Sequence, residues 1–356
     1  MKKFYTMLLA ALVLTGCEKK WDPNNPFRPD APKPAEPEVR TASIGIIGDM
    51  ADVQTTTKSG IVIMGGGSDV DAAFRWMIDR SGGGDVVIIR ATGTDAYNNY
   101  IKGLGTVNSI ETLKIDSRKL ADNDAVAKII RDAEMLFIAG GDQSDYTNYW
   151  KGTKVMSAIN YLLTEKKVPV GGTSAGAAIL GNYYFSAERG GIDLSLNIDA
   201  LANPYVDRVT IGRDDFLKAP FLQNVITDQH YSQRNRQGRS VAFLGRIMKD
   251  WSKTPNGIAV DEATAVCIDE TGMAQVIGTN KAFFLKTNAT KAPETFTIGS
   301  PVTWNNGGQA IQVSVISGIA ANNKFNMNTF EPETTAGLEK YWWSVVAGNR
   351  VQTARP

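Results

Sequence analysis

The sequence predicts an α/β fold with a mostly parallel, doubly wound sheet that carries helices on both faces. From about residue 60 onward, short apolar runs typical of buried strands alternate with segments of helical periodicity. Several of these runs end in two or three glycines. In such sheets the functional site lies beyond the carboxyl ends of the strands, so we expect the glycine-rich corners to meet in space.

The predicted elements follow in chain order. A buried strand with a glycine turn is expected at Gly60–Gly67, and apolar spacing of about 3.6 predicts a helix at Asp69–Arg80. The remaining elements up to the middle of the chain are strands at Asp85–Ala91, Ile110–Asp116, Glu134–Gln143 and Val168–Ser174, with helices at Asn123–Ala133 and Lys154–Glu165. The glycine-rich corners are Gly65–Gly67, Gly140–Gly141 and Gly171–Gly176.

The N-terminus predicts export. A charged start precedes the short apolar run Met7–Leu14, and small residues then lead to Cys17, which is typical of a bacterial secretory signal. The Leu-Thr-Gly-Cys junction resembles a lipobox. We therefore expect residues 1–17 to be a lipoprotein signal peptide and Cys17 to carry the lipid, so that the mature protein is exported and anchored to a bacterial membrane. An ordinary cleaved signal peptide is the alternative.

The rest of the chain divides into three parts. Residues 18–41 are rich in proline and charge and lack periodicity, which predicts a disordered tether. Residues 42–287 are expected to form the catalytic α/β domain, and residues 288–356 a β-rich extension. In that extension Trp342 and Trp343 either stack on a ligand or, as we expect, pack the tail onto the main domain.

Composition excludes several classes of protein. The 356 residues carry a net charge of +1, which argues against a nucleic-acid partner. Two cysteines cannot build a disulfide framework or a multi-thiolate metal site, and we expect no metal and no cofactor. The GGGSDV stretch lacks the third glycine of a dinucleotide fingerprint, and a P-loop is absent from the sequence. The oligomeric state stays open, a homodimer being one candidate.

The segment Val168–Gly181, VPVGGTSAGAAILG, predicts a nucleophile. Ser174 lies between Gly172 and Gly176 in a Gly-Thr-Ser-Ala-Gly pattern that fits a strand–turn–helix nucleophile elbow. Such a turn presents the hydroxyl at the sheet edge, and a side chain at either flanking glycine would clash with a neighbouring strand or helix. It also directs the N–H of Ala175 toward a developing oxyanion. The alternative is a glycine-rich connection with an incidental serine.

A serine nucleophile needs a base, and the sequence contains one histidine, His230. It follows the apolar run Phe221–Ile226 and so lies just past another predicted strand end. An acid must orient the imidazole. Asp261 and Glu262, after the apolar Gly257–Val260, are both candidates, whereas Asp228 is awkwardly close in sequence. The order serine, histidine, acid argues against an α/β-hydrolase, in which the acid precedes the histidine.

Four motifs together resemble the cyanophycinases of the peptidase E-like serine peptidase family (S51). They are AGGDQ, GGTSAGA, TDQHYSQRNRQGR and GIAVDEATA, and the resemblance covers about Gly60–Lys286. It implies a glutamine-amidotransferase-like, flavodoxin-like fold and a triad of Ser174, His230 and Glu262. It also implies a substrate site lined by Gln143, Asp228, Gln229, Arg234, Arg236 and Arg239.

The resemblance implies cleavage of β-linked aspartyl peptides, such as release of β-aspartyl-arginine from cyanophycin. Arginines and an aspartate suit a substrate that carries carboxylates and guanidiniums. We further expect the N–H groups of Gly141 and Ala175 to form the oxyanion hole. Two alternatives remain: a dipeptidase for short aspartyl or isoaspartyl peptides, and a non-catalytic surface binding lipoprotein. The segment Ser186–Leu222, longer than a minimal cyanophycinase would need, leaves the substrate open.

Overall fold

A computed structural model of the protein describes residues 40–191, 199–333 and 335–356. The predicted signal peptide with Cys17, and the tether as far as Val39, lie outside the described residues. Residues 40–356 belong to one unit. Its helices are α1 (Asp71–Ser81), α2 (Ala96–Lys102), α3 (Arg118–Ala121), α4 (Asp124–Asp132), α5 (Gln143–Trp150), α6 (Lys154–Tyr161), α7 (Ala175–Ala178) and α9 (Gln237–Trp251), with a π-helical turn at Leu162–Lys166 and a 3-10 turn at Asn306–Gly308.

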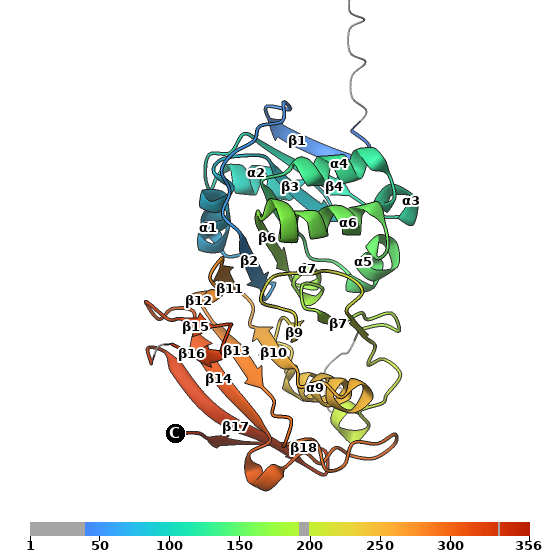
Figure 1. The fold of residues 1–356 in the computed structure, drawn as a ribbon, viewed down its shortest axis with the longest axis vertical. Coiled ribbons are helices and arrows are strands. Elements are labelled where there is room, and N and C mark those ends of the chain that lie inside the picture. The colour runs from blue at the N-terminus through green and yellow to red at the C-terminus, as the bar shows by residue number, and fades with distance from the viewer. Residues whose placement is uncertain (1–39, 192–198, 334) are drawn as a thin grey trace, which may run out of the picture. The chain divides into compact units, whose positions relative to one another are not determined.

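The strands form two sheets, here called sheet A and sheet B (Figure 1). Sheet A has the order β1 (Ser43–Gly48), β4 (Ser109–Lys114), β3 (Val86–Arg90), β5 (Met135–Ile138), β6 (Pro169–Thr173), β2 (Gly60–Met64), β11 (Thr264–Asp269), β12 (Met273–Gly278), β15 (Phe325–Asn326) and β16 (Glu331–Pro332). Sheet B has the order β18 (Asn349–Ala354), β17 (Leu338–Val346), β14 (Ile311–Ser317), β13 (Lys281–Lys286), β10 (Asn256–Val260), β9 (Val225–Asp228), β7 (Tyr183–Phe185) and β8 (Ile211–Arg213).

The centre of sheet A is the predicted parallel sheet. Strands β4, β3, β5, β6 and β2 pair in parallel, and their side chains alternate between two cores. On β2, Ile61 and Ile63 pack with residues of α4 to α6, whereas Val62 and Met64 pack with Phe74 of α1. Because both faces are covered by helices, the inner strands β2, β3 and β5 are almost entirely apolar instead of alternating with polar residues.

The prediction of one mostly parallel sheet is wrong for the structure as a whole. Antiparallel strands extend sheet A on both sides, and sheet B is largely antiparallel. After β10 the chain crosses repeatedly between the sheets: β11 and β12 join sheet A, β13 and β14 join sheet B, and β15 and β16 return to sheet A. Each crossing is a short connection, which leaves no room for the crossover helices of a parallel sheet.

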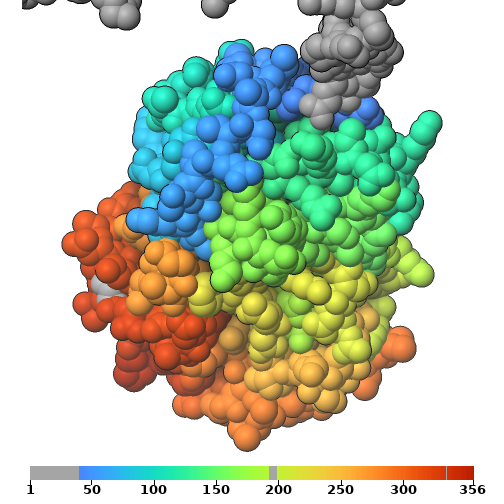
Figure 2. All heavy atoms as spheres, turned by 45° about the horizontal axis from the view of Figure 1, so that its top comes forward, coloured from blue at the N-terminus to red at the C-terminus, as the bar shows by residue number. Residues whose placement is uncertain are grey.

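The tail after residue 287 adds strands to both sheets. Strand β14 pairs with β13, and β15 pairs with β12. The predicted β-rich extension is therefore hydrogen-bonded to one strand of the predicted catalytic domain in each sheet. Figure 2 shows these later segments, in orange and red, in direct contact with the rest of the molecule. Cys267 on β11 is buried, as its alternation with apolar residues predicts.

The two adjacent tryptophans of β17 lie in different surroundings. Trp343 is 1% exposed and belongs to an apolar cluster that includes Leu285, and its ring centroid lies 6.4 Å from that of Phe283 on β13 of the main domain. Trp342, on the opposite face, lies within cation–π distance of Lys291 and Arg355. The expected packing role therefore holds for Trp343.

This difference predicts unequal effects of truncation. Trp343→Ala should lower the free energy of unfolding by about 3–5 kcal/mol, because it empties a large buried site. Trp342→Ala should cost about 1 kcal/mol or less, the scale of an exposed cation–π contact. Urea unfolding of both variants measures this, and equal losses would contradict the assignment of Trp343 to the core.

Candidate active site

Ser174 occupies a strained corner at the end of β6. Its backbone has φ 53° and ψ −118°, a positive φ that residues other than glycine rarely adopt. The serine N–H donates to the carbonyl of Met64 on β2 (3.2 Å), and the serine carbonyl accepts from Ala178 of α7 (3.0 Å). The corner is therefore held from the neighbouring strand and from the following helix.

The glycines on either side of Ser174 leave no space for a side chain. A Cβ on Gly172 would lie 2.5 Å from the backbone of Gly176, and a Cβ on Gly176 would lie 2.1 Å from the carbonyl oxygen of Ile138 on β5. This is the clash with helix and strand that the Gly-Thr-Ser-Ala-Gly pattern predicts. The two glycines let α7 start directly against β5 and β6 and so fix the direction of the serine.

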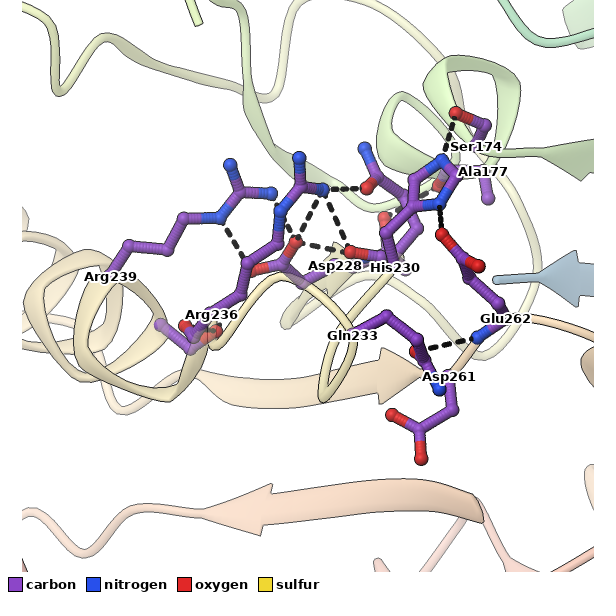
Figure 3. Close-up of polar contacts among 12 residues, drawn as sticks. Ser174, Ala177, Asp228, His230, Gln233, Arg236, Arg239, Asp261 and Glu262 are labelled. Atoms are coloured by element: carbon purple, nitrogen blue, oxygen red, sulfur yellow. Dashed lines mark hydrogen bonds and ion pairs between the residues drawn. The ribbon is translucent and has the colours of Figure 1, made fainter. Parts of the chain in front are cut away.

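His230 reaches Ser174 from sheet B. It lies two residues after β9, with φ 47°, and its N–H donates to the carbonyl of Gly65 at the end of β2 (2.8 Å). His230 Nε2 lies 2.7 Å from Ser174 Oγ (Figure 3). The single histidine is thus within hydrogen-bonding distance of the predicted nucleophile, in the geometry of a general base.

Glu262 completes the arrangement from the turn between β10 and β11. Its Oε1 lies 2.6 Å from His230 Nδ1. Asp261, the neighbouring candidate, is directed elsewhere: its Oδ1 accepts the N–H of Ser232 (2.8 Å) and the residue is buried. Of the two acids that the sequence leaves open, the structure brings Glu262 to the imidazole.

The surroundings favour a neutral His230. Burial lowers the pKa of the imidazole below its usual 6.5; the hydrogen bond to Glu262 raises it, and the positive charges of Arg234 and Arg236 lower it again, with a net decrease. A neutral imidazole can accept a proton from Ser174, and the carboxylate of Glu262 stabilises the imidazolium that would form.

The three glycine-rich corners converge on Ser174, as predicted. A Cβ on Gly66 would lie 2.5 Å from His230 Nε2 and 3.1 Å from the Cβ of Ser174. A Cβ on Gly140 would lie 3.3 Å from the Cβ of Ser174. The N–H groups of Gly141 and Ala175 donate to no acceptor within the described residues, so both remain available to a developing oxyanion.

A cavity of about 580 Å³ opens at Ser174. The predicted site residues that line it are Gly141, Gln143, Gln229, Arg234, Arg236 and Arg239. Five lining residues were missed from the sequence: Asp142, Phe185, Ala187, Gly191 and Gln233. Of these, Asp142 and Gln233 lie inside quoted motifs and could have been found there. Phe185 is the last residue of β7, and Ala187 lies at the start of the longer segment 186–222.

Asp228 does not line this cavity but lies beneath it. It is 4% exposed, and its carboxylate accepts from Arg239 through two hydrogen bonds and from Ser240 Oγ (2.9 Å). Burial raises the pKa of Asp228, but Arg239 and Arg236 outweigh this effect and lower it below its usual value. The expected substrate contact of Asp228 is therefore replaced by a buried ion pair.

The three arginines differ in their partners. Arg239 is bound to Asp228, and Arg236 donates from Nη1 to the carbonyl oxygen (2.7 Å) and side-chain oxygen of Gln229. Burial, and then the charge of Arg239, lower the pKa of Arg236 to about 9. Arg234 precedes α9 and is exposed at the cavity.

No group of three or more His, Cys, Asp or Glu side chains in the described ranges could hold a metal ion. The site consists instead of a serine, a histidine and a glutamate in hydrogen-bonding sequence, next to a cavity with cationic walls. Such a constellation can activate a hydroxyl for attack on a carbonyl.

Comparison with known proteins agrees with this chemistry. Residues 61–276 match the profile of peptidase family S51. The chain belongs to this family. It is 25% identical over 236 residues to the cyanophycinase of Trichormus variabilis, covering 62% of this chain and 72% of that protein. It is 27% identical over 240 residues to the cyanophycinase of Synechococcus elongatus, covering 63% and 67%.

A solved structure of a peptidase from an acI-B1 Actinobacterium is also similar. It has a TM-score of 0.46 and 18% sequence identity, and the match covers 64% of this chain and 91% of that one. Membership of family S51 therefore rests on the sequence profile, which spans the segment from β2 to β12 and includes the whole Ser174–His230–Glu262 arrangement.

Gly66 provides a test of the site geometry. Gly66→Ala should slow the reaction of Ser174 with a small fluorophosphonate by about a hundredfold, because the new Cβ displaces the His230 ring by a sizeable fraction of an ångström. Gly299 is a matched control, since it also has a positive φ (70°) but nothing lies within 4 Å of an added Cβ. Equal labelling rates in Gly66→Ala and Gly299→Ala would contradict the close packing of Gly66 on His230.

Proposed function

We propose that the protein is a serine-type peptidase of cyanophycinase type, which hydrolyses β-linked aspartyl peptides through an acyl-enzyme. The observation that carries this proposal is the hydrogen-bonded series from Ser174 to His230 to Glu262 at the mouth of a cavity with arginine walls. The resemblance to cyanophycinases supports the substrate class and the finer fold assignment, a glutamine-amidotransferase-like, flavodoxin-like core with a β-rich C-terminal extension.

The proposed reaction has two steps. His230 Nε2 accepts the proton of Ser174 Oγ as the oxygen attacks the substrate carbonyl, and the N–H groups of Gly141 and Ala175 stabilise the oxyanion. His230 then donates this proton to the leaving amine, which leaves an acyl group on Ser174. A water molecule then attacks the ester as His230 takes up its proton. The bond between the acyl carbon and Ser174 Oγ breaks, Oγ regains a proton from His230, and the acid product is released.

Arg234 is proposed to bind a substrate carboxylate. All three arginines line the cavity, and Arg234 differs from the other two in that its side chain is exposed, whereas Arg236 and Arg239 are buried. A guanidinium can hold a carboxylate through two parallel hydrogen bonds. In a cyanophycin-type substrate each arginine is joined to the β-carboxyl of an aspartate through its amino group, so the arginine keeps a free carboxylate that suits such a contact.

Two alternatives are distinguished by substrate. A dipeptidase of the same fold would cleave short aspartyl or isoaspartyl peptides but not the polymer. A non-catalytic surface binding lipoprotein would bind such peptides without cleaving them. The presence of all three triad side chains in hydrogen-bonding geometry favours an enzyme over a binding protein.

Export and lipid anchoring through Cys17 are also proposed, from the Leu-Thr-Gly-Cys junction alone. Over the described residues, none of the helices is both long and apolar enough to span a bilayer. In this proposal the anchor would be the lipid on Cys17, and residues 18–41 would link it to the catalytic domain of residues 42–287.

The decisive experiment measures hydrolysis of cyanophycin, β-aspartyl dipeptides and α-aspartyl dipeptides by the purified protein. We expect β-aspartyl products, and Ser174→Ala should reduce the rate by several orders of magnitude while remaining folded, because the triad acts as a unit. Substantial activity of Ser174→Ala would contradict the acyl-enzyme. Binding without cleavage by the native protein would favour the surface binding alternative.

These assignments predict that substitution of Arg234 affects the affinity for substrate, whereas substitution of Arg239 affects the stability of the fold. Arg234→Lys should raise KM for β-aspartyl substrates about tenfold, because lysine lacks the planar fork. Arg239→Lys should instead lower the free energy of unfolding by about 1–3 kcal/mol, through loss of a charge-assisted hydrogen bond to Asp228. Steady-state kinetics and urea unfolding of both variants, with Arg236→Lys alongside, measure this. A native KM in Arg234→Lys would contradict the proposed carboxylate contact.

The anchoring proposal predicts that Cys17→Ser releases or misprocesses the protein. Lipid attachment requires the thiol, so the variant should move from the membrane fraction to the soluble fraction or retain its leader. Detergent-phase partitioning with metabolic labelling by a fatty acid measures this. Membrane association that does not depend on Cys17 would contradict the proposal.

A further inference from the structure

The turn that carries His230 and the turn that carries Glu262 are tied together by two reciprocal hydrogen bonds. The N–H of Ser232 donates to the side chain of Asp261 (2.8 Å), and the N–H of Glu262 donates to Gln233 Oε1 (3.0 Å). Each turn thus supplies one side-chain acceptor for a backbone N–H of the other. Figure 3 shows the second bond beside the contact between Glu262 and His230.

Gln233 is the exposed member of this pair of acceptors. The other N–H groups of the Glu262 turn donate to backbone carbonyls, Asp261 to Lys281 (3.0 Å) and Ala263 to Gly66 (3.1 Å). The N–H of Glu262 itself depends on a side chain. Because the Glu262 side chain is about one-third exposed, packing alone does not fix its orientation, and a hydrogen bond at its own backbone restricts it directly.

Gln233 also lines the cavity at Ser174. A backbone N–H can donate to the oxygen of a glutamine amide but not to its nitrogen. The bond from Glu262 therefore identifies the Gln233 atom that faces it as Oε1. The NH₂ group of Gln233 is therefore left as a donor, and it donates to no acceptor within the described residues. An amide whose oxygen holds the triad turn and whose nitrogen remains unused borders the substrate cavity.

We propose that Gln233 is a positioning residue for Glu262 through Oε1, and that its NH₂ group donates a hydrogen bond to a carbonyl or carboxylate oxygen of the bound peptide. The inference rests on the proposed function, because it assigns a substrate contact in the same cavity. It links occupation of the cavity to the alignment of the acid that orients His230.

The test separates the two ends of the amide. Gln233→Met removes both the acceptor and the donor, and Gln233→Glu keeps an acceptor oxygen but removes the donor. The rate at which a small neutral fluorophosphonate labels Ser174 reports triad alignment alone. We expect Gln233→Met to slow labelling about tenfold, the scale of one lost hydrogen bond, and Gln233→Glu to restore it to within about threefold of native. KM for a carboxylate-bearing peptide should rise about tenfold or more in both variants.

Gln275→Met is the matched control, because Gln275 is an exposed glutamine on β12 outside the cavity lining; it should behave as native. Hydrogen exchange at the Glu262 amide should increase in Gln233→Met but not in the control, a readout that does not depend on activity. Native labelling in Gln233→Met, or equally slow labelling in Gln233→Met and Gln233→Glu, would overturn the positioning role. A native KM in Gln233→Glu would overturn the substrate contact. If native protein is not labelled at all, the proposed function fails, whereas the exchange result still reports on the link between the turns.

Discussion

The site depends on the turn Gly65–Gly67, because two separate segments, the His230 turn and the turn from Glu262 into β11, are hydrogen-bonded to its backbone. The carbonyl of Gly65 accepts the N–H of His230, and the carbonyl of Gly66 accepts the N–H of Ala263, next to Glu262. The N–H of Gly65 donates to Thr264 at the start of β11. Side chains are excluded here, since a Cβ on Gly65 would lie 1.9 Å from the carbonyl oxygen of Asp261. The end of β2 in sheet A thereby sets where the histidine and glutamate turns of sheet B stand relative to Ser174.

Backbone strain accompanies this convergence. Ser174, His230 and Ala263 all have positive φ values although none is a glycine, and each such residue costs about 1–3 kcal/mol. The surrounding structure stabilises these conformations through hydrogen bonds from β2 and through the buried network of Asp228, Arg236 and Arg239. That network lies directly before and after the His230 turn in the chain. A rigid frame around the histidine is consistent with a site in which the serine and imidazole are held in hydrogen-bonding distance before a substrate arrives.

Local sequence was sufficient to predict the parallel core of sheet A, because apolar runs and helical periodicity are local properties. It was sufficient for the convergence of the glycine-rich corners, because these glycines end parallel strands. Local sequence could not predict sheet B. The distribution of β11 to β16 over two sheets depends on pairing between segments that are distant in the chain. Local sequence also left open which of Asp261 and Glu262 contacts His230. The contact depends on tertiary structure, because the N–H of Ser232 donates to Asp261 and Glu262 is the acid that reaches the imidazole. The sequence did not distinguish the roles of Arg234, Arg236 and Arg239. In the structure Arg234 is exposed, whereas Arg236 and Arg239 are buried.

The charges around His230 connect substrate binding with base strength. Before binding, burial and the positive charges of Arg234 and Arg236 keep the pKa of His230 low, so the imidazole is neutral. In the proposed complex a substrate carboxylate at Arg234 would offset part of that positive charge. The pKa of His230 would then rise, because one of the two opposing cations is compensated while the hydrogen bond to Glu262 remains. A stronger base would thus be present when an anionic substrate occupies the cavity. A neutral peptide would bring no such negative charge and would leave the imidazole less basic. Selectivity for acidic peptides would then come from base strength as well as from the contact with Arg234.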